Sequence, residues 1–407
     1  MKKVRNGILL IALTVGAVRP AAAAFVVGGE NGWQFSTDGI VDVFADYRTT
    51  GQLPTGSRFI SFLGSNDQNF GVEVGLLPSV VAFNVKAPTV NGVDSTVRIG
   101  IYPSIQNKSQ NTRFETNPNI DFREIYYTAK GKYGELLAGR ALNLYQGKNI
   151  LTDMTLLTAG VVPGPATTTT LGHIGYGYLY TNFGPQLRYT TPDLNGIKVA
   201  VSVNEPYKIS ADTAKTPTPR IESEVSYATV LKGGSTFQAW VSGLYQSATR
   251  KQGVARAGAQ NESIGGAAGV EAGLGGIDLL ASGYYGEGLG MISAQDGDAF
   301  GSSSTDGAGK ERTHFGFLGQ VTYKVTPDIK IGANYGQTRQ VESEFDKANR
   351  GTGTVPMQKQ EAAVAMVTYN FNKFTQFIAE YTYAQNTWHD QATQHSNSVA
   401  VGTLFYW

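Results

Sequence analysis

Residues 197–204 read IKVAVSVN, and their alternation decides the fold class of this chain. Apolar side chains fall on every second position, at Ile197, Val199, Val201 and Val203. The positions between them hold Lys198, Ala200, Ser202 and Asn204. Because successive side chains of an extended strand point to opposite faces, this stretch predicts a strand with one apolar and one largely polar face.

The same period of two recurs along the chain. It is visible in 315–323, in 329–336 and in 35–47, where acidic side chains oppose apolar ones. Helical periodicity is scarce. The sequence therefore predicts an all-β protein.

The connections between these strands alternate between short and long. Seven short turns are expected at 87–93, 130–134, 193–196, 232–234, 274–276, 326–328 and 372–373. Eight long polar or Gly/Ser-rich connections are expected at 49–69, 106–119, 141–182, 205–220, 248–262, 287–312, 340–358 and 387–395. These fifteen connections join sixteen antiparallel strands, with one long strand over about 70–86. Counting 57–64 (SRFISFLG) as a further strand would give eighteen.

Two architectures can use strands of this kind. A soluble sandwich buries the apolar faces against each other, whereas a membrane barrel turns them to lipid and lines a wet lumen with the polar faces. Short turns at one end and long loops at the other favour a transmembrane antiparallel β-barrel with periplasmic turns and external loops. Aromatic residues beside the short turns, such as Tyr133 and Phe374, suit the lipid interface.

Composition excludes several classes of protein. The chain has 407 residues, of which 16% are charged, with 50 glycines and no cysteine. So low a charge content argues against a disordered chain or a coiled coil. Without cysteine there is no disulfide framework, no thiolate metal site and no cysteine nucleophile. A net charge of +1 argues against nucleic acid as a partner.

The first 24 residues look like a targeting segment and not like a part of the folded domain. Lys2, Lys3 and Arg5 precede a short apolar run, and 21–24 is a run of alanines. This is the pattern of a secretory signal peptide. Removing 1–24 takes away four of the 33 basic residues and leaves 29 against 32 acidic residues, a net charge of −3. We expect an exported, slightly acidic domain over 25–407.

Three stretches resemble the Gram-negative outer-membrane porins. The segment Phe122–Arg140, FREIYYTAKGKYGELLAGR, resembles a porin strand–turn–strand, and LRYTTPDLNGIKVAV at 187–201 resembles the next hairpin. The ending VAVGTLFYW at 399–407 resembles the last porin strand, with Phe405 and Trp407 as the assembly signal. The usual last residue of the family is Phe, so Trp407 is a conservative departure.

The resemblance implies a homotrimer in the cell outer membrane. Its expected partners are outer-membrane lipid and lipopolysaccharide, the barrel assembly machinery and small hydrophilic solutes. It also implies that the third external loop folds into the lumen and narrows it. The matching segment is 141–182, which carries Leu142, Leu144, Ile150, Leu151, Met154, Leu156 and Leu157 and is too apolar for a solvated tip.

Ion selectivity in such a channel depends on charged side chains at its narrowest point. Alternation places Arg98 and Arg188 in the lumen, and the resemblance adds Arg140. Within 141–182 the candidates are Lys148, Asp153 and His173. With one acidic residue in that loop, we expect a mild anion preference. The lumen-lining candidates are Lys198, Glu222, Glu224, Lys330 and Glu380, and the three glutamates among them would oppose that preference.

Catalysis and metal binding are not expected. There are four histidines, and neither a G-x-S-x-G nor an H-E-x-x-H motif occurs. Asp38, Asp42 and Asp46 share a strand face, but successive members are about 14 Å apart, which suits a lumen lining better than a calcium site. We therefore expect neither a metal site nor a cofactor.

Two kinds of channel stay open, and so does a surface adhesive β-protein. One is a passive diffusion channel for small hydrophilic solutes and ions, and the other is a substrate-specific channel with a solute site in its lumen. Sugar-specific channels line the lumen with aromatic ladders. Alternation places only Tyr102, Trp240 and Phe374 inside, on strands far apart, which favours the general channel.

Overall fold

The computed structural model describes residues 25–59, 61–64, 67–106, 120–164, 169–292 and 304–407. The predicted signal peptide at 1–24 lies outside these residues, as does most of the expected loop at 106–119.

Nineteen strands are formed by the described residues. They are β1 (Phe25–Gly28), β2 (Gln34–Thr50), β3 (Asp67–Glu73), β4 (Val80–Lys86), β5 (Asp94–Pro103), β6 (Ile120–Gly131), β7 (Gly134–Leu142), β8 (Phe183–Thr190), β9 (Ile197–Asn204), β10 (Thr213–Lys215), β11 (Arg220–Val230), β12 (Thr236–Arg250), β13 (Gln260–Leu274), β14 (Ile277–Glu287), β15 (Thr313–Lys324), β16 (Ile329–Gln340), β17 (Met357–Asn370), β18 (Thr375–Trp388) and β19 (Thr393–Tyr406). Two short α-helices, α1 (Gly147–Thr152) and α2 (Glu344–Asn349), lie in loops, as do 3-10 turns at Met154–Leu157 and Leu289–Ile292.

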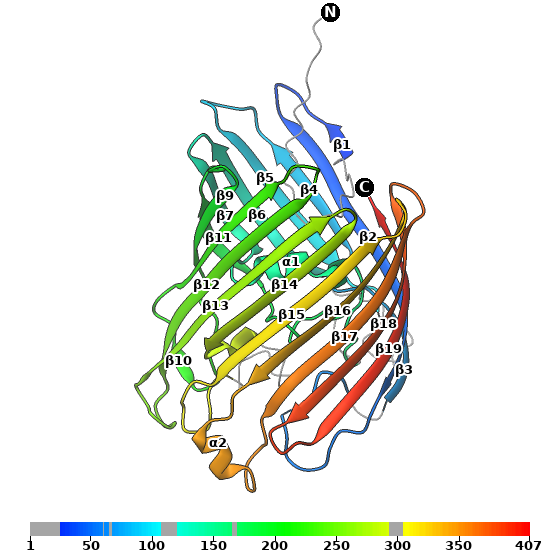
Figure 1. The fold of residues 1–407 in the computed structure, drawn as a ribbon. Helices are drawn as coiled ribbons and strands as arrows, with labels where there is room; N and C mark the ends of the chain where they lie inside the picture. Colours follow the sequence, from blue (N-terminus) through cyan, green and yellow to red (C-terminus); the bar gives the residue numbers. More distant parts are fainter. Residues whose placement is uncertain (1–24, 60, 65–66, 107–119, 165–168, 293–303) are drawn as a thin grey trace, which may run out of the picture.

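The sheet closes on itself as a barrel of sixteen antiparallel strands (Figure 1). Closure comes from β19, which pairs with β2 from Tyr406↔Ile40 to Ser396↔Thr50. Both β3 and β4 pair with β2, at Phe44↔Glu73 and Ile40↔Val80, so they are two halves of one wall strand interrupted at 74–79. The short strands β1 and β10 lie beside this barrel wall and complete the nineteen.

The predicted strand count of sixteen is confirmed. Residues 57–64 would have raised it to eighteen, but the described residues of this stretch (57–59 and 61–64) contain only an isolated bridge from Arg58 to Val355. The predicted strand over 70–86 exists but breaks at its centre, where the N–H of Gly75 turns inward to the carboxylate of Asp42 at 2.6 Å.

The apolar face of each strand points outward, as expected for a barrel in lipid. Val241 on β12 is 59% exposed, whereas Trp240, the residue before it, is 2% exposed. Other exposed apolar side chains with the same alternation include Val41, Ile125, Leu187, Val201, Ile331 and Val399. A sandwich would bury this face against a second sheet, so that alternative is wrong.

The two ends of the barrel differ as predicted. Figure 1 shows the C-terminus and β1 at one end, together with the short turns, and α2 and β10 among the long loops at the other. The final external connection, 389–392, is shorter than the expected 387–395 because β18 and β19 extend further. Among the described residues no helix is long and apolar enough to cross a membrane.

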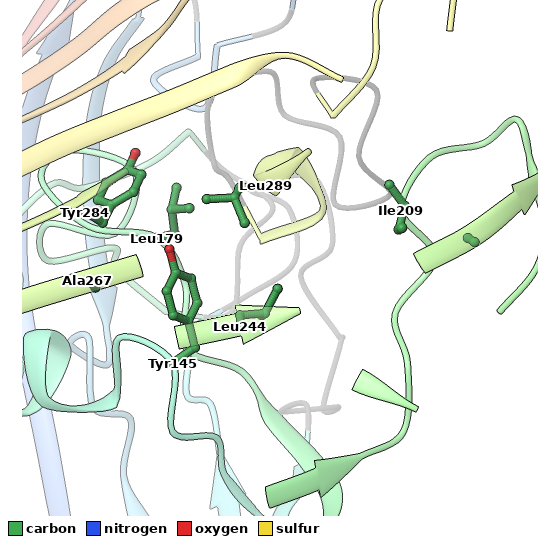
Figure 2. Packing of buried hydrophobic residues seen from close by; sticks show 8 residues of the cluster. Tyr145, Leu179, Ile209, Leu244, Ala267, Tyr284 and Leu289 are labelled. Atoms are coloured by element: carbon green, nitrogen blue, oxygen red, sulfur yellow. The ribbon is translucent and has the colours of Figure 1, made fainter. Parts of the chain in front are cut away.

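Apolar clusters fill part of the barrel interior. One joins Tyr145 and Leu179, from the loop between β7 and β8, to Leu244, Ala267 and Tyr284 on the wall (Figure 2). The loop is therefore packed inside the barrel and is not spread over its rim.

Candidate functional site

The loop between β7 and β8, residues 143–182, is here called the inner loop. Its beginning is fixed by Glu222, which points inward from β11. That carboxylate accepts hydrogen bonds from the backbone N–H groups of Leu144 at 2.8 Å and Tyr145 at 3.0 Å. The next N–H, of Gln146, donates to the hydroxyl of Ser242 at 3.1 Å. Backbone donors that would otherwise lie unpaired inside the barrel are thus satisfied by wall side chains.

The middle of the inner loop is held from the opposite part of the wall. Glu380 on β18 accepts hydrogen bonds from the N–H of Gly160 at 2.6 Å and from the hydroxyl of Thr158. Gln320 on β15 accepts from the N–H of Met154 at 2.7 Å. Glu222 and Glu380 do face inward, as alternation predicts, but they are 2% and 4% exposed and meet the loop instead of water.

Asp153 and His173 form a buried pair within the inner loop. The carboxylate of Asp153 accepts from the Tyr178 hydroxyl at 2.7 Å and from the Thr155 hydroxyl at 2.6 Å, and the Nδ1 atom of His173 lies 3.6 Å away. Burial raises the pKa of Asp153, but His173 and the donors from Thr155 outweigh burial and hold this pKa below its usual value. Both side chains are fully buried, so they stabilise the loop and do not face the water of the channel.

Apolar side chains of the inner loop pack against more than one part of the wall, and Ala159 and Val162 lie in a buried cluster with Phe44, Ile378, Ala400 and Leu404. Ile150, Leu156 and Tyr178 contact Trp240, Leu280 and Leu318 in a second buried cluster. The indole N–H of Trp240 also donates to Asn149 at 3.0 Å. In Figure 1, α1 accordingly lies at mid-height within the outline of the barrel.

The three aromatics expected in the lumen differ in position. Trp240 and Tyr102 face inward but are covered, being 2% and 6% exposed. Phe374 lies at a short turn, is 42% exposed and contacts the ring of Phe405 on the outer face, so its predicted inward position is wrong. These three residues therefore form no aromatic ladder.

Arg98 on β5 faces the lumen between two carboxylates. Its Nη1 atom donates to both oxygens of Asp38 at 2.9 and 3.0 Å, and its Nε atom donates to Glu124 at 2.9 Å. The hydroxyl of Tyr102 donates to the same Glu124 at 2.7 Å. Arg98 therefore forms ion pairs with two carboxylates, those of Asp38 and Glu124, and its positive charge is fully compensated.

Two other cations lack such compensation. Within the described part of the chain, no carboxylate lies within 4 Å of Arg188 on β8 or of Lys148 at the start of α1. The guanidinium of Arg188 makes one weak hydrogen bond, to the Leu142 carbonyl at 3.4 Å. Glu224 on β11 lies within electrostatic range of both cations. Lys148 from the inner loop and Arg188 from the wall are therefore two of the inward cations that no carboxylate of the described residues contacts directly, although Glu135 and Glu222 also lie within electrostatic range of Arg188.

Arg140 lies on the outer wall. In the β7 register it pairs with Ile125 and Pro185, and Ile125 is itself exposed on the outside. The Arg140 guanidinium is exposed and donates to the Phe183 carbonyl at 2.7 Å. This placement leaves Arg140 out of the lumen, contrary to the expectation drawn from the resemblance.

The other expected lining residues face inward. Lys198 on β9 is exposed and pairs in register with Ser226, and Lys330 on β16 precedes Ile331, which faces outward. No group of three or more His, Asp or Glu side chains in the described residues could hold a metal ion.

The C-terminal residue is built into the wall. The N–H of Trp407 donates to the Gly39 carbonyl at 3.2 Å, and the N–H of Gly39 donates back to Trp407 at 3.3 Å. Phe405 is 49% exposed on the outer face, with its ring centroid 6.5 Å from that of Trp407.

Comparison with known proteins identifies relatives of this architecture. A family model described as Gram-negative porin matches residues 10–389. The outer-membrane channel DcaP of Acinetobacter baumannii is 15% identical, with a TM-score of 0.67, and the match covers 94% of this chain and 100% of DcaP. An anion-selective porin from Comamonas acidovorans is 12% identical, with a TM-score of 0.63, covering 92% of this chain and 100% of that one.

A third similar structure is a trimer form of OmpT from Vibrio cholerae. It is 13% identical, with a TM-score of 0.56, and the match covers 93% of this chain and 100% of OmpT. At these identities the solved structures establish a shared fold. No curated protein matches the chain.

Proposed function

We propose a function from the premise that this chain belongs to the Gram-negative porin family. It forms a weakly selective diffusion channel for small hydrophilic solutes, and this channel has a mild preference for anions. The family and the sixteen-stranded barrel support an outer-membrane channel for solute diffusion. A barrel of sixteen strands encloses a lumen wide enough for a water-filled channel, whereas side chains fill the interior of a barrel of eight strands. We further propose that 1–24 directs export and that, as in the trimer form of OmpT, three copies assemble.

The observation that supports an anion preference is that three inward acids bond to the inner loop and do not face the water of the channel. The carboxylates of Glu222, Glu380 and Asp153 are buried and accept hydrogen bonds from donors in the inner loop. Lys148 and Arg188 keep no partner carboxylate within 4 Å among the described residues. Since Glu224 lies near both, the excess of positive potential is small, and the preference it produces is mild.

The test is the reversal potential of the channel in a planar bilayer under a salt gradient. The reversal potential of wild type should have the sign of an anion-preferring channel. In the double variant Lys148→Gln with Arg188→Gln, the reversal potential should shift toward the sign of a cation-preferring channel. Arg140→Gln is the matched control, because it removes one cation from the outer wall and should leave the potential unchanged. A cation preference in wild type would contradict the proposal.

The same recordings separate a general channel from a specific one. A general channel conducts in proportion to salt concentration and voltage. Saturable block by one solute at micromolar concentration, an affinity of about −8 kcal/mol, would instead indicate a binding site in the lumen.

A further inference from the structure

The first external loop, between β2 and β3, contributes a segment that enters the barrel. Its described residues 57–59 and 61–64 are here called the spacer segment. At the mouth, the Ser57 carbonyl accepts from the N–H of Val355 at 2.9 Å, and the N–H of Phe59 donates to the Val355 carbonyl at 3.1 Å. Arg58 forms an ion pair with Asp390. The outer end of the spacer segment is therefore tied to the loop that contains α2 and to the last external connection.

The spacer segment then follows the inner surface of β18. The indole N–H of Trp388 donates to the Phe59 carbonyl at 3.1 Å, and the side-chain amide of Asn386 donates to the Ser61 hydroxyl at 2.6 Å. Trp388, Asn386 and Ala384 are alternate, buried residues of β18 and share its inward face. The segment thus occupies space inside the barrel at the external ends of the strands.

Leu63 lies between the wall and the inner loop. Its side chain is 0% exposed. On one side it contacts Ala362 of β17 and Ala384 of β18, and the same buried cluster contains Val161 and Tyr176 of the inner loop. The two alanines are small, so the wall leaves room there for a leucine side chain.

Backbone contacts fix the same arrangement. The N–H of Gly164, in the inner loop, donates to the Phe62 carbonyl at 2.6 Å. The approach is close, because a Cβ added at Gly164 would lie 3.1 Å from the Cα of Gly64. Nearer the short turns the inner loop bonds directly to Glu380 of β18. Toward the external side, one layer of chain therefore separates the inner loop from this part of the wall.

This extra layer affects the space that is left for water. The strand number fixes the size of a closed barrel, so a chain segment inside it reduces the open cross-section. Protein interiors are close-packed, and a shortened side chain is followed by partial collapse of its neighbours. A smaller residue in place of Leu63 would let the inner loop move toward β17 and β18, away from the open part of the lumen.

We propose that the spacer segment, with Leu63 as its positioning residue, sets the width of the channel by holding the inner loop away from β17 and β18. The inference rests on the proposed diffusion channel and specifies how that channel selects solutes by size. The inner loop narrows the lumen, and the spacer segment determines how far into the lumen the inner loop extends.

Swelling of proteoliposomes in a series of neutral sugars, from a monosaccharide to a tetrasaccharide, tests this role without a contribution from charge. In Leu63→Ala the size limit should shift to a longer sugar, and the single-channel conductance should rise. Leu63→Val, a smaller truncation, should give a smaller shift in the same direction and serves if Leu63→Ala does not fold. Adding Ala384→Leu to Leu63→Ala returns volume to the same cluster and should move the size limit back toward wild type.

Leu53→Ala is the matched control. It truncates a leucine of the same external loop that packs against Val355, Met357 and Trp388 at the mouth. Its size limit should equal that of wild type. A shift in Leu53→Ala as large as that in Leu63→Ala would show a general loosening of the loop and would overturn the proposal.

An unchanged or smaller size limit in Leu63→Ala, with the variant shown to be folded by heat-dependent gel migration, would also overturn it. That result leaves the diffusion channel intact as long as wild type passes the smaller sugars. A wild type that passes neither sugars nor salt would contradict the diffusion channel itself. In that case a permeable Leu63→Ala would support the spacer segment, and an impermeable one would overturn both proposals.

Discussion

The carboxylate of Glu380 on the barrel wall accepts a hydrogen bond of 2.6 Å from the backbone N–H of Gly160, 220 residues earlier in the chain. With Glu222 and the N–H groups of Leu144 and Tyr145, it fixes the inner loop at two points inside the barrel. Glu380 and Glu222, which would otherwise line the channel, are therefore structural groups.

Removing the Glu380 anchor should loosen the inner loop. In Glu380→Ala the N–H of Gly160 and the hydroxyl of Thr158 lose their acceptor, which costs about 1–3 kcal/mol for a buried unpaired group. We expect a lower urea midpoint for unfolding from vesicles and noisier single-channel currents. Glu224→Ala is the control, because no hydrogen bond joins Glu224 to the described part of the inner loop. Currents in Glu380→Ala as quiet as those of wild type would count against this role.

Gly160 should be intolerant of a side chain. Its φ of 63° lies in the left-handed region, and a Cβ there would collide with the backbone of Gly172. Gly160→Ala should therefore displace the loop, with reduced stability and altered conductance. Gly351→Ala is the matched control, since a Cβ at Gly351 meets nothing within 4 Å. Identical conductance of Gly160→Ala and wild type would be inconsistent with the described loop path.

Cysteine labelling should separate the two arginines. The native chain contains no cysteine, so an introduced thiol is labelled without background. In bilayer recordings, a charged, water-soluble thiol reagent should reduce the current through Arg188→Cys. Labelling of Arg140→Cys should leave the current unchanged, because Arg140 lies on the outer wall. The reverse pattern would show that the β7–β8 register is wrong.

Acid should loosen the external loop that contains α2. Burial raises the pKa of Asp346, but the two bonds from Arg312, at 2.7 and 2.8 Å, and the cap with Ser343 outweigh burial and lower this pKa overall. A carboxylate whose folded pKa is depressed stabilises the fold above its unfolded pKa of about 3.9, and the contribution is lost as pH falls toward the folded value.

Hydrogen exchange of 341–356 measures that loss. In wild type, exchange in this loop should accelerate as pH falls below about 4, after correction for intrinsic exchange rates. Asp346→Asn should exchange faster already at neutral pH and respond less to acid. Asp328→Asn, in a short turn at the opposite end of the barrel, is the control. A loop that responds to acid equally in Asp346→Asn and wild type would refute the role of this ion pair.

Much of the wall could be predicted from the sequence because a barrel strand alternates between lipid and lumen. The period of two gives the sixteen strands and the inward direction of Arg98, Arg188, Glu222 and Glu380. It groups Arg140 with Leu136 and Ala138 without deciding which side they face, and the structure shows that Leu136, 43% exposed, lies on the outside.

Alternation could not predict what each inward side chain contacts in the folded barrel. Glu222 contacts the inner loop because two backbone donors lie beside it that are 77 and 78 residues away in the chain. A local alternation of apolar and polar residues carries no information about such distant contacts. Asp153 and His173 lie in an irregular loop, so alternation does not apply to them, and only the folded contacts show that both are buried. The break between β3 and β4 likewise depends on Asp42, more than thirty residues earlier in the chain.

The most direct measurement is single-channel conductance of the refolded protein lacking 1–24, in a planar bilayer. An open trimer of water-filled barrels predicts large ohmic steps that arrive in threes and grow with salt concentration. Stable insertion of folded protein without any conductance would show that the inner loop closes the barrel, and would contradict the diffusion channel.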